Sequence, residues 1–362
     1  MEQRHSDLYR FHYRPAKGWI NDPNGLVWFK GYYHIFYQHA PHYETPWRES
    51  MHWGHARTRD FIHYEELPPA LCPDRPYDKD GCWSGTAIVK DGVLYLFYAC
   101  IREGTQAVAA AYSEDGVRFE KYEGNPVIAG YPADGSPDFR DPALCFADGK
   151  YRCVMASGNR ERNSAVLLLY ESDDLLRWRY QGVLREWENA KFAECPSFLP
   201  FGDRYLLAAS VCREDGHSFS MAVGTFENGR FTAQITGEAD RGPDQYAGQI
   251  FRDPRGRALL ISWIPGWDYA GYRDRDIGCM SVPREVLLKD GVLRVCPAEE
   301  VRRFIAPGDP ALTRTENGFR IRRAGREDAV YTGELRELAC IRDGDVLEVF
   351  VNGGEEVYTA LL

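Results

Sequence analysis

The chain has 362 residues, of which 44% are hydrophobic and 27% are charged, as is usual for a globular protein of one or two domains. Its net charge of −10 and its lack of a long Lys or Arg run argue against nucleic-acid binding. No apolar run approaches the ~20 residues that a membrane-spanning helix needs, so we expect no membrane partner.

The first residues and the cysteines bear on the cellular compartment. The segment MEQRHSDLYRFHYRP lacks the apolar core of a secretory signal. The ten cysteines are scattered without a C-x-x-C pair or the spacing of a small disulfide scaffold, which is typical of free thiols in a reducing compartment. We therefore expect a cytoplasmic protein.

Short alternating segments that favour strands recur along the chain, and a tight turn divides each of them. X-Gly and Gly-Asp pairs supply the positive φ that two-residue hairpin turns require. Successive turns lie 61, 57, 54 and 53 residues apart. The turn pairs are Lys30-Gly31, Asp91-Gly92, Asp148-Gly149, Gly202-Asp203 and Arg255-Gly256.

A second marker follows the hairpins in step. It consists of a hydroxyl residue, an acid two positions later and an aromatic residue four positions after the acid, at residues 58–64, 113–119 and 172–178, with a weaker copy at 225–231. A hydroxyl and an acid at this spacing close a local turn. Five such units predict an all-β chain with a five-bladed β-propeller over residues 1–300.

The repeat also predicts which residues face the axis. The innermost strand of each propeller blade approaches a central channel, so residues at the entry of each such strand should converge. Counting back seven to nine residues from each hairpin turn gives Asp22, Ser84, Asp141, Glu194 and Tyr246.

The tetrapeptide FRDP occurs twice, and its two copies have different positions in the repeat. Asp141 lies seven residues before its turn, at a strand entry, whereas Asp253 lies two residues before the Arg255-Gly256 turn. We expect Asp141 to belong to a site and Asp253 to lie in a solvated turn.

Three of the converging residues carry carboxyl groups: Asp22, Asp141 and Glu194. Like charges repel, so such a cluster is typical of catalysis or cation binding. Cleavage of a glycosidic bond needs one ionised and one protonated carboxyl group. Asn21 beside Asp22 and Arg140 beside Asp141 favour the ionised form, whereas Glu194, in KFAECPSF, has the apolar neighbours that suit a proton donor.

Two other patterns are read as structural. His52 and His55 in HWGH lie on a strand-like segment, where they do not share a helical face, so we expect no metal and no cofactor. Cys195 lies beside Glu194 but has no histidine in phase to activate it, and we expect a small buried residue.

The segments GWINDPNGLVWFKGYYHIFYQHAP, MHWGHARTRDFIHYEELPPAL, GCWSGTAIV, FRDP and ECP together resemble glycoside hydrolase family 32, the β-fructofuranosidases, from about His12 to Glu300. The resemblance implies retaining hydrolysis of terminal β-fructofuranosyl linkages in sucrose or short fructo-oligosaccharides. It implies Asp22 as nucleophile, Glu194 as general acid/base and Asp141 as stabiliser of the transition state. Retention predicts that the carboxyl groups of Asp22 and Glu194 lie roughly 5–5.5 Å apart.

The resemblance also implies a set of residues that bind the fructosyl unit. Three positions depart from the family pattern, at Trp83, Arg48 and Ser197, and leave the substrate preference open. The implied binding residues are Asn21, Gln38, Trp47, Trp83, Ser84, Arg140, Tyr246 and Trp263.

Residues 305–362 have a different character, with alternating segments such as DVLEVFVNGGEEVYTALL. They resemble part of the family's C-terminal β-sandwich, but only about 58 residues are present. We expect a shortened C-terminal β-sandwich-like module with open sheet edges and one incompletely covered face. Such a module would pack on the propeller or pair between subunits as a homo-oligomer.

Other functions stay open at this stage. A fructosyltransferase would use the same covalent intermediate, a pentose-specific propeller hydrolase would invert, and a carbohydrate-binding propeller would not catalyse at all. The leaving sugar is equally open, whether from sucrose, a fructo-oligosaccharide or sucrose 6-phosphate. A phosphorylated substrate would need a Lys, Arg or His cluster at the outer rim, which the sequence does not locate.

Overall fold

The computed structural model describes residues 9–43, 48–214, 216–265 and 278–362. These residues form β-strands almost throughout, with a short 3₁₀ helix, η2 (Glu299–Phe304), after the strand β21. The prediction of an all-β chain is confirmed. No helix in these ranges is both long enough and apolar enough to cross a membrane.

Five antiparallel sheets of four or five strands follow one another in the described part of the chain. The first contains β1 (Trp19–Phe29), β2 (Tyr32–Ala40), β3 (His52–Thr58) and β4 (Tyr64–Leu71). The second contains β5 (Gly81–Lys90), β6 (Val93–Arg102), β7 (Thr105–Ser113) and β8 (Glu120–Lys121). The third contains β9 (Phe139–Ala147), β10 (Lys150–Asn159), β11 (Ser164–Ser172) and β12 (Arg179–Glu188). The fourth contains β13 (Phe192–Phe201), β14 (Arg204–Arg213), β15 (Gly216–Glu227) and β16 (Arg230–Glu238). The fifth contains β17 (Tyr246–Arg252), β18 (Ala258–Ile264), β19 (Cys279–Met280), β20 (Arg284–Lys289) and β21 (Val292–Pro297).

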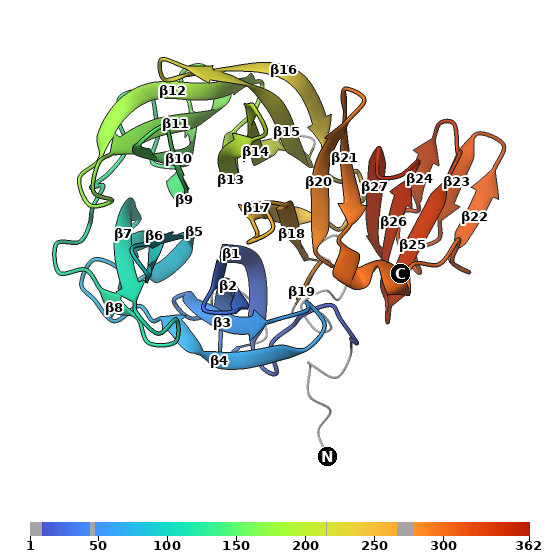
Figure 1. The fold of residues 1–362 in the computed structure, drawn as a ribbon, viewed down its shortest axis with the longest axis horizontal. Coiled ribbons are helices and arrows are strands. Elements are labelled where there is room, and N and C mark those ends of the chain that lie inside the picture. The colour runs from blue at the N-terminus through green and yellow to red at the C-terminus, as the bar shows by residue number, and fades with distance from the viewer. Residues whose placement is uncertain (1–8, 44–47, 215, 266–277) are drawn as a thin grey trace.

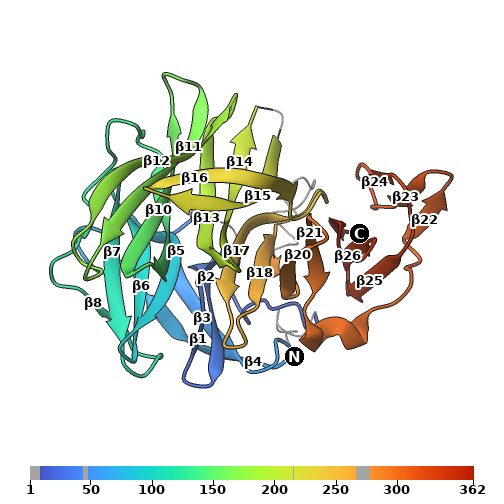
Figure 2. The ribbon, with the colours of Figure 1, turned by 45° about the horizontal axis from the view of Figure 1, so that its top comes forward.

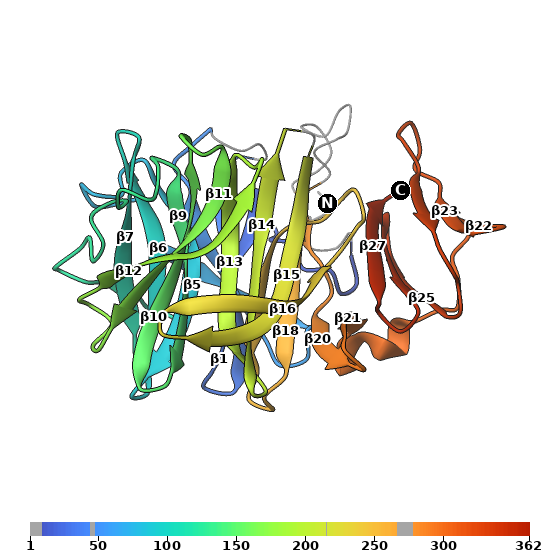
Figure 3. The same cartoon turned by 90° about the horizontal axis from the view of Figure 1, so that it is seen from above.

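These sheets stand around a common centre, with β1, β5, β9, β13 and β17 innermost (Figure 1). Each innermost strand contacts the innermost strand of the next sheet, and β17 contacts β1, so the ring closes. Seen from above, the inner strands run side by side along the axis of the ring (Figure 3). This blade-like arrangement fits a propeller.

Apolar side chains of neighbouring sheets pack against each other and form the core. Between the first and second sheets, for example, Phe36 and Trp53 pack with Leu94, Leu96 and Tyr98. Equivalent clusters fill the spaces between the other neighbouring sheets. The aromatic residues are therefore used mainly to hold the sheets together, which fixes the inner strands around the axis.

A β-bulge interrupts each innermost strand near its start, so that two of its residues face one residue of the next strand. Bulges redirect side chains and often lie beside functional sites. The first bulge residue is Asp141 in β9, Cys195 in β13 and Ala247 in β17, with φ values of 58°, 46° and 52°. A left-handed backbone at a residue other than glycine costs about 1–3 kcal/mol. These bulges therefore lower the stability of the folded protein while they direct side chains toward the axis.

The hydroxyl-and-acid turns form in the first three sheets. At the first of them, Thr58 Oγ1 accepts the N–H of Phe61 at 2.9 Å, and Asp60 Oδ1 accepts the N–H of Ile62 at 3.0 Å. The same pattern recurs at residues 113–118 and 172–177. The prediction of a fourth such turn, at residues 225–231, is wrong. There, β15 continues to Glu227, which pairs with Arg230 across an Asn228-Gly229 hairpin.

The expectation that Asp253 lies in a solvated turn is also wrong. Asp253 does sit in the hairpin between β17 and β18, but its side chain is fully buried. Its Oδ1 accepts the N–H groups of Arg255 at 3.0 Å and Arg257 at 2.8 Å, and its Oδ2 accepts Arg257 Nε at 2.8 Å. Asp253 is therefore a buried anchor of its hairpin.

Two three-stranded sheets follow the ring and lie beside β20 and β21 (Figures 1 and 2). The sixth sheet contains β22 (Leu312–Thr315), β23 (Gly318–Ile321) and β24 (Ala329–Thr332), and the seventh contains β25 (Leu338–Asp343), β26 (Val346–Val351) and β27 (Glu356–Leu361).

The seventh sheet is covered on both faces. Ile341, Phe350 and Val357 pack into the core between the fourth and fifth sheets, whereas Val349 and Tyr358 pack against the sixth sheet. The incompletely covered face expected from the sequence is therefore absent from this sheet in the described chain.

Buried charges join the seventh sheet to the ring. Arg284 on β20 is fully buried and contacts Asp240 at 2.6 Å and Glu348 on β26 at 2.7 Å. His12 lies between Glu348 and Asp343, at 2.9 Å and 3.1 Å. Asp343 Oδ2 also accepts the backbone N–H groups of residues 10, 11 and 12 at 2.9–3.1 Å. The N-terminal segment is thus held by the last sheet.

Candidate active site

A cavity of about 420 Å³, the carboxylate pocket, opens where the innermost strands begin. Asp22, Asp141 and Glu194 all line it, each from a different sheet. Trp47 lies outside the described residues. The pocket also contains the seven other residues implied as binding residues: Asn21, Gln38, Trp83, Ser84, Arg140, Tyr246 and Trp263.

Asp22 is partly buried and lies in the bulge of β1. Its Oδ2 accepts Ser84 Oγ at 2.6 Å, and its Oδ1 accepts Asn21 Nδ2 at 3.2 Å. Burial and the nearby charge of Glu194 raise the pKa of Asp22, whereas these hydrogen bonds oppose the rise. Gly85 follows Ser84, and a Cβ at Gly85 would lie 2.0 Å from the carbonyl oxygen of Phe97, so a glycine is needed for β5 to approach β6 at this point.

Asp141 accepts the backbone N–H of Cys195 at 2.9 Å. Burial, together with the charges of Glu194 and Asp22, raises the pKa of Asp141 to about 7, although Arg140 acts in the opposite direction. The expectation that Arg140 holds Asp141 in its charged form is therefore wrong. The guanidinium group of Arg140 contacts Glu194 and Asp138 instead.

Glu194 is not in the apolar setting that its sequence neighbours suggest. Its Oε1 accepts Arg140 Nε at 3.0 Å and lies 2.9 Å from Nη2 of the same residue. Its Oε2 accepts the hydroxyl of Tyr246. Burial and the charge of Glu194 hold the pKa of Tyr246 well above its usual range, so Tyr246 stays a hydrogen-bond donor.

Cys195 links two of the carboxylates. Its Sγ lies 3.4 Å from Asp22 Oδ2 and 3.6 Å from Asp141 Oδ2, so its single S–H can donate to either carboxylate. Burial and the surrounding carboxylates raise the pKa of the thiol far above its usual range, so it remains protonated and is not a nucleophile. The residue is buried, as expected, but its bridging contacts could not be seen in the sequence.

Three further residues of the pocket were missed: Trp19, Phe192 and Cys212. Trp19 Nε1 donates to Asn21 Oδ1 at 3.0 Å, and its ring lies edge-on to Trp263 at 5.7 Å. Phe192 lies 5.0 Å from the guanidinium of Arg140. Phe192 could have been found, because residues two apart on a strand share a face and Phe192 precedes Glu194 by two.

The carboxylate pocket can hold protons near neutral pH. The pKa values of Asp22 and Asp141 are both raised, because both carboxyl groups are shielded from solvent and lie close to that of Glu194. Carboxyl groups with raised pKa values hold their protons closer to neutral pH than free carboxyl groups do. Among the described residues, no group of three or more His, Cys, Asp or Glu side chains is placed to hold a metal ion.

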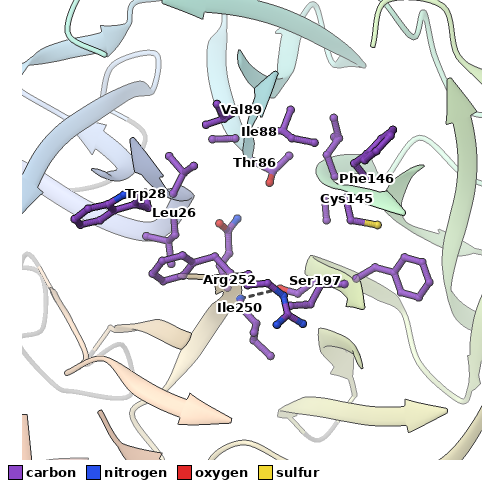
Figure 4. Close-up of a pocket in the computed structure, with 18 of the residues that line it drawn as sticks. Leu26, Trp28, Thr86, Ile88, Val89, Cys145, Phe146, Ser197, Ile250 and Arg252 are labelled. Atoms are coloured by element: carbon purple, nitrogen blue, oxygen red, sulfur yellow. Dashed lines mark hydrogen bonds between the residues drawn. The ribbon is translucent and has the colours of Figure 1, made fainter. Parts of the chain in front are cut away.

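A second cavity of about 540 Å³ lies at the far end of the innermost strands (Figure 4). Apolar side chains such as Leu26, Ile88 and Ile250 line it. Among the residues that the structure describes, the only carboxylate that lines it is that of Asp253, which already pairs with Arg257. Ser197, one of the departures from the family pattern, lies in this cavity and not in the carboxylate pocket. The cavity lacks the free acids that glycosidic chemistry needs.

Residues 12–297 match the model of the glycosyl hydrolases family 32 N-terminal domain. The chain is 35% identical over 326 residues to a raffinose invertase of Escherichia coli, and 36% identical over 326 residues to a sucrose-6-phosphate hydrolase of the same organism. Each alignment covers 83% of this chain, which spans about two thirds of the length of these relatives, 67% and 66% respectively.

A solved structure of similar fold is that of a beta-fructofuranosidase variant from Bombyx mori in complex with sucrose. The TM-score is 0.83 at 25% sequence identity, and the superposition covers 98% of this chain and 88% of the other.

Proposed function

The chain belongs to glycoside hydrolase family 32, and we propose from this membership that it hydrolyses terminal β-fructofuranosyl linkages in sucrose or short fructo-oligosaccharides with retention at the anomeric carbon. The observation that carries the proposal is that three carboxyl groups from three different sheets line one cavity. The names of the relatives, an invertase and a sucrose-6-phosphate hydrolase, point to the same class of substrate.

In the first step, the carboxylate of Asp22 attacks the anomeric carbon of the fructosyl ring while Glu194 gives a proton to the departing oxygen. An ester bond to Asp22 forms and the bond to the leaving sugar breaks. The hydrogen bonds from Ser84 and Asn21 favour the ionised form of Asp22 that this step needs.

In the second step, Glu194 takes a proton from water, and the resulting hydroxide attacks the anomeric carbon and breaks the ester bond. Fructose leaves, and both carboxyl groups return to their starting states. Arg140 and Tyr246 orient Glu194 in both steps through their contacts with its two oxygens. Asp141, beside the anomeric site, binds fructosyl hydroxyl groups.

We also assign a five-bladed β-propeller to residues 1–300 and a shortened C-terminal β-sandwich-like module to residues 305–362. The closed contact ring of inner strands supports the first assignment, and the facing sixth and seventh sheets support the second. The ten cysteines are all free, in keeping with a reducing compartment such as the cytoplasm.

The test is the product formed from sucrose, followed by NMR. We expect fructose to appear first as the β-furanose anomer, and Asp22→Asn to abolish its release while the variant melts like the wild type. Glucose released in excess of fructose at high sucrose concentration would indicate transfer to a sugar instead of water. First appearance of the α-anomer, or no release from sucrose or kestose, would refute the proposal.

A further inference from the structure

The thiol of Cys212 lines the carboxylate pocket but takes no part in the steps proposed above. Cys212 lies on β14, and its side chain is partly exposed. Its Sγ is 2.9 Å from the hydroxyl oxygen of Tyr246, which in turn donates to Glu194 Oε2. A continuous chain of three polar groups therefore leads from this thiol to the carboxyl group that acts as acid and base in the proposed function.

The direction of the hydrogen bonds in this chain follows from what each group can give. A tyrosine hydroxyl has one proton and two lone pairs, and a thiol is a weak donor and a weak acceptor. Burial and the charge of Glu194 hold the pKa of Tyr246 well above its usual range and raise the pKa of Cys212 to about 12, so both groups keep their protons. With Glu194 ionised, Tyr246 donates to the carboxylate and accepts the S–H of Cys212.

The thiol supports Tyr246 in both protonation states of Glu194. A hydroxyl whose oxygen accepts a hydrogen bond becomes a stronger donor, because successive hydrogen bonds polarise one another. The S–H of Cys212 therefore strengthens the bond from Tyr246 to the ionised carboxylate. When Glu194 carries a proton it is a poorer acceptor, and the Tyr246 hydroxyl can turn its own proton toward the sulfur. Cys212 thus gives Tyr246 a partner throughout the proton transfer.

Two further contacts from the fourth sheet fix the start of β17 and keep the side chain of Tyr246 in place. His217 Nε2 donates to the carbonyl oxygen of Gln245 at 3.0 Å, and its ring packs edge-on to that of Tyr246 at 4.8 Å. Ser210 Oγ accepts the N–H of Ala247 at 3.2 Å. Ser210 lies two positions before the thiol on β14, so the two side chains share the face that meets β17. The thiol is therefore the middle one of three contacts to three consecutive residues.

We propose that Cys212 is a positioning residue for proton transfer at Glu194, and that it acts through Tyr246. The inference rests on the proposed function. Cys212 promotes the cleavage of bonds whose leaving oxygen needs a proton. It leaves the attack by Asp22 unaffected, because the hydrogen bonds to Asp22 come from other side chains.

The first test compares kcat/KM for sucrose in the wild type, Cys212→Ala and Cys212→Ser. Loss of one weak hydrogen bond should lower kcat/KM about two- to tenfold in Cys212→Ala, through kcat and with KM little changed. Cys212→Ser should keep most of the activity, because its hydroxyl group can also donate and accept. Cys296→Ala is the matched control, since that thiol is also partly exposed but donates to the backbone oxygen of Gly353 at 3.2 Å, on β21. It should behave like the wild type.

A change of leaving group separates a role in proton transfer from a general loss of structure. A p-nitrophenolate ion leaves without needing a proton, so kcat/KM for p-nitrophenyl β-D-fructofuranoside should be the same in the wild type and in Cys212→Ala. Because kcat/KM covers only the steps up to the release of the leaving group, the later attack by water does not enter. An equal loss on both substrates would overturn the proposal.

A double-mutant cycle tests whether Cys212 acts through Tyr246. Tyr246→Phe removes a hydrogen bond to a charged group and should lower kcat/KM for sucrose about ten- to hundredfold. Adding Cys212→Ala to Tyr246→Phe should cause no further loss, because the chain of hydrogen bonds is already broken. Additive losses would indicate that Cys212 acts on the reaction directly and would overturn the proposal.

Infrared spectroscopy of the thiol separates this inference from the proposed function. The difference spectrum between the wild type and Cys212→Ser contains the S–H stretching band of Cys212. The hydrogen bond should hold this band at a lower frequency than in the same difference measured in Tyr246→Phe. A chain that cleaves no fructoside but shows this shift would refute the proposed function and leave the contact between Cys212 and Tyr246 standing. A band at the same frequency in both backgrounds would refute the inference.

Discussion

Asp141 combines two unfavourable features in one residue. Its backbone has a φ of 58°, and its carboxyl group is buried beside those of Glu194 and Asp22. Both features place a carboxyl group in the carboxylate pocket, and both oppose folding. Residues arranged in this way for chemistry can commonly be replaced with a gain in stability.

We expect Asp141→Asn to be more stable than the wild type at pH 8, with a difference that shrinks toward pH 4. The folded protein keeps the proton of Asp141 up to a pKa of about 7, whereas the unfolded chain loses it near 3.8. Stability contributed by this group therefore falls as the pH rises between these values. Urea unfolding from pH 4 to pH 8 should show a gain on the order of 1 kcal/mol or more at the upper end.

Asparagine tolerates a positive φ, so the substitution adds no backbone strain. Asp203→Asn is the control, because the side chain of Asp203 is 93% exposed. An Asp141→Asn protein with the same pH dependence as the wild type would contradict this account of the site.

The positions of the three acids could be predicted from the sequence, but their partners could not. Arg140 and Asp141 are neighbours in the chain, yet Arg140 pairs with Glu194 on the next sheet. Consecutive strand residues point to opposite faces, and the bulge at Asp141 changes the direction of its side chain further. Sequence neighbours are thus a poor guide to the charges around a strand residue.

The hairpin is the element in which the two FRDP copies differ. The first copy begins β9, where Asp141 lies in the bulge, whereas Asp253 lies in the β17–β18 hairpin and accepts two backbone N–H groups and the Arg257 guanidinium group. Arg257 in turn pairs with Glu300 on η2 at 2.8 Å. One buried carboxylate therefore ties the β17–β18 hairpin to the helix that follows the ring.

Asp253→Asn should destabilise the protein by about 2–4 kcal/mol without changing kcat on sucrose. The change leaves Arg257 without its buried partner, far from the carboxylate pocket. The pKa of Asp253 is held below its usual value although burial opposes this, because backbone N–H groups and Arg257 stabilise the ionised form. Its contribution is therefore lost as the pH falls through that lowered pKa.

The matched control is Asp91→Asn, an exposed acid in the hairpin turn of the second sheet with a φ of 50°. Thermal melts and initial rates should show no change there. If Asp253→Asn has the same melting temperature as Asp91→Asn, or if it loses activity while folded, Asp253 is not the stabilising anchor described here.

Turn chemistry explains which elements could be predicted. Pairs such as Asp91-Gly92 need a positive φ, and this local need is visible in the sequence. A β-bulge adds one residue without changing the composition of its strand, so none of the five was predicted. The fourth hydroxyl-and-acid pattern, at Thr225, failed because a stronger hairpin signal, Asn228-Gly229, follows it at once.

At the scale of the whole molecule, the last two sheets are part of the same packed body as the ring. Ile341, Phe350 and Val357 complete the core of the fourth and fifth sheets, and Glu348 pairs with the fully buried Arg284. The seventh sheet is covered because strands of the preceding repeat, β20 and β21, pack against it, whereas the sixth sheet keeps the exposed face that the sequence suggested.

A chain shortened to residues 1–304 should therefore fail to unfold cooperatively and should show no activity on sucrose. Its Arg284 would lose Glu348, and breaking a buried pair costs about 3–5 kcal/mol even before the exposed apolar surface is counted. Circular dichroism melts and sucrose assays of the soluble fraction measure this. Val330→Thr, on the exposed face of the sixth sheet, is the control for a change in the module alone. A shortened chain that melts like the full one would contradict the shared core.

The grip of Asp343 on the backbone of residues 10–12 has a consequence for biosynthesis. During translation, residues 10–12 are synthesised more than three hundred residues before Asp343, which binds their backbone. Until Asp343 has been synthesised, residues 10–12 cannot form these hydrogen bonds, and the contact between them and the seventh sheet is absent. We therefore expect the chain to become resistant to proteases when β25 to β27 have been translated. Synthesis of Asp22, Asp141 and Glu194 alone should not be sufficient.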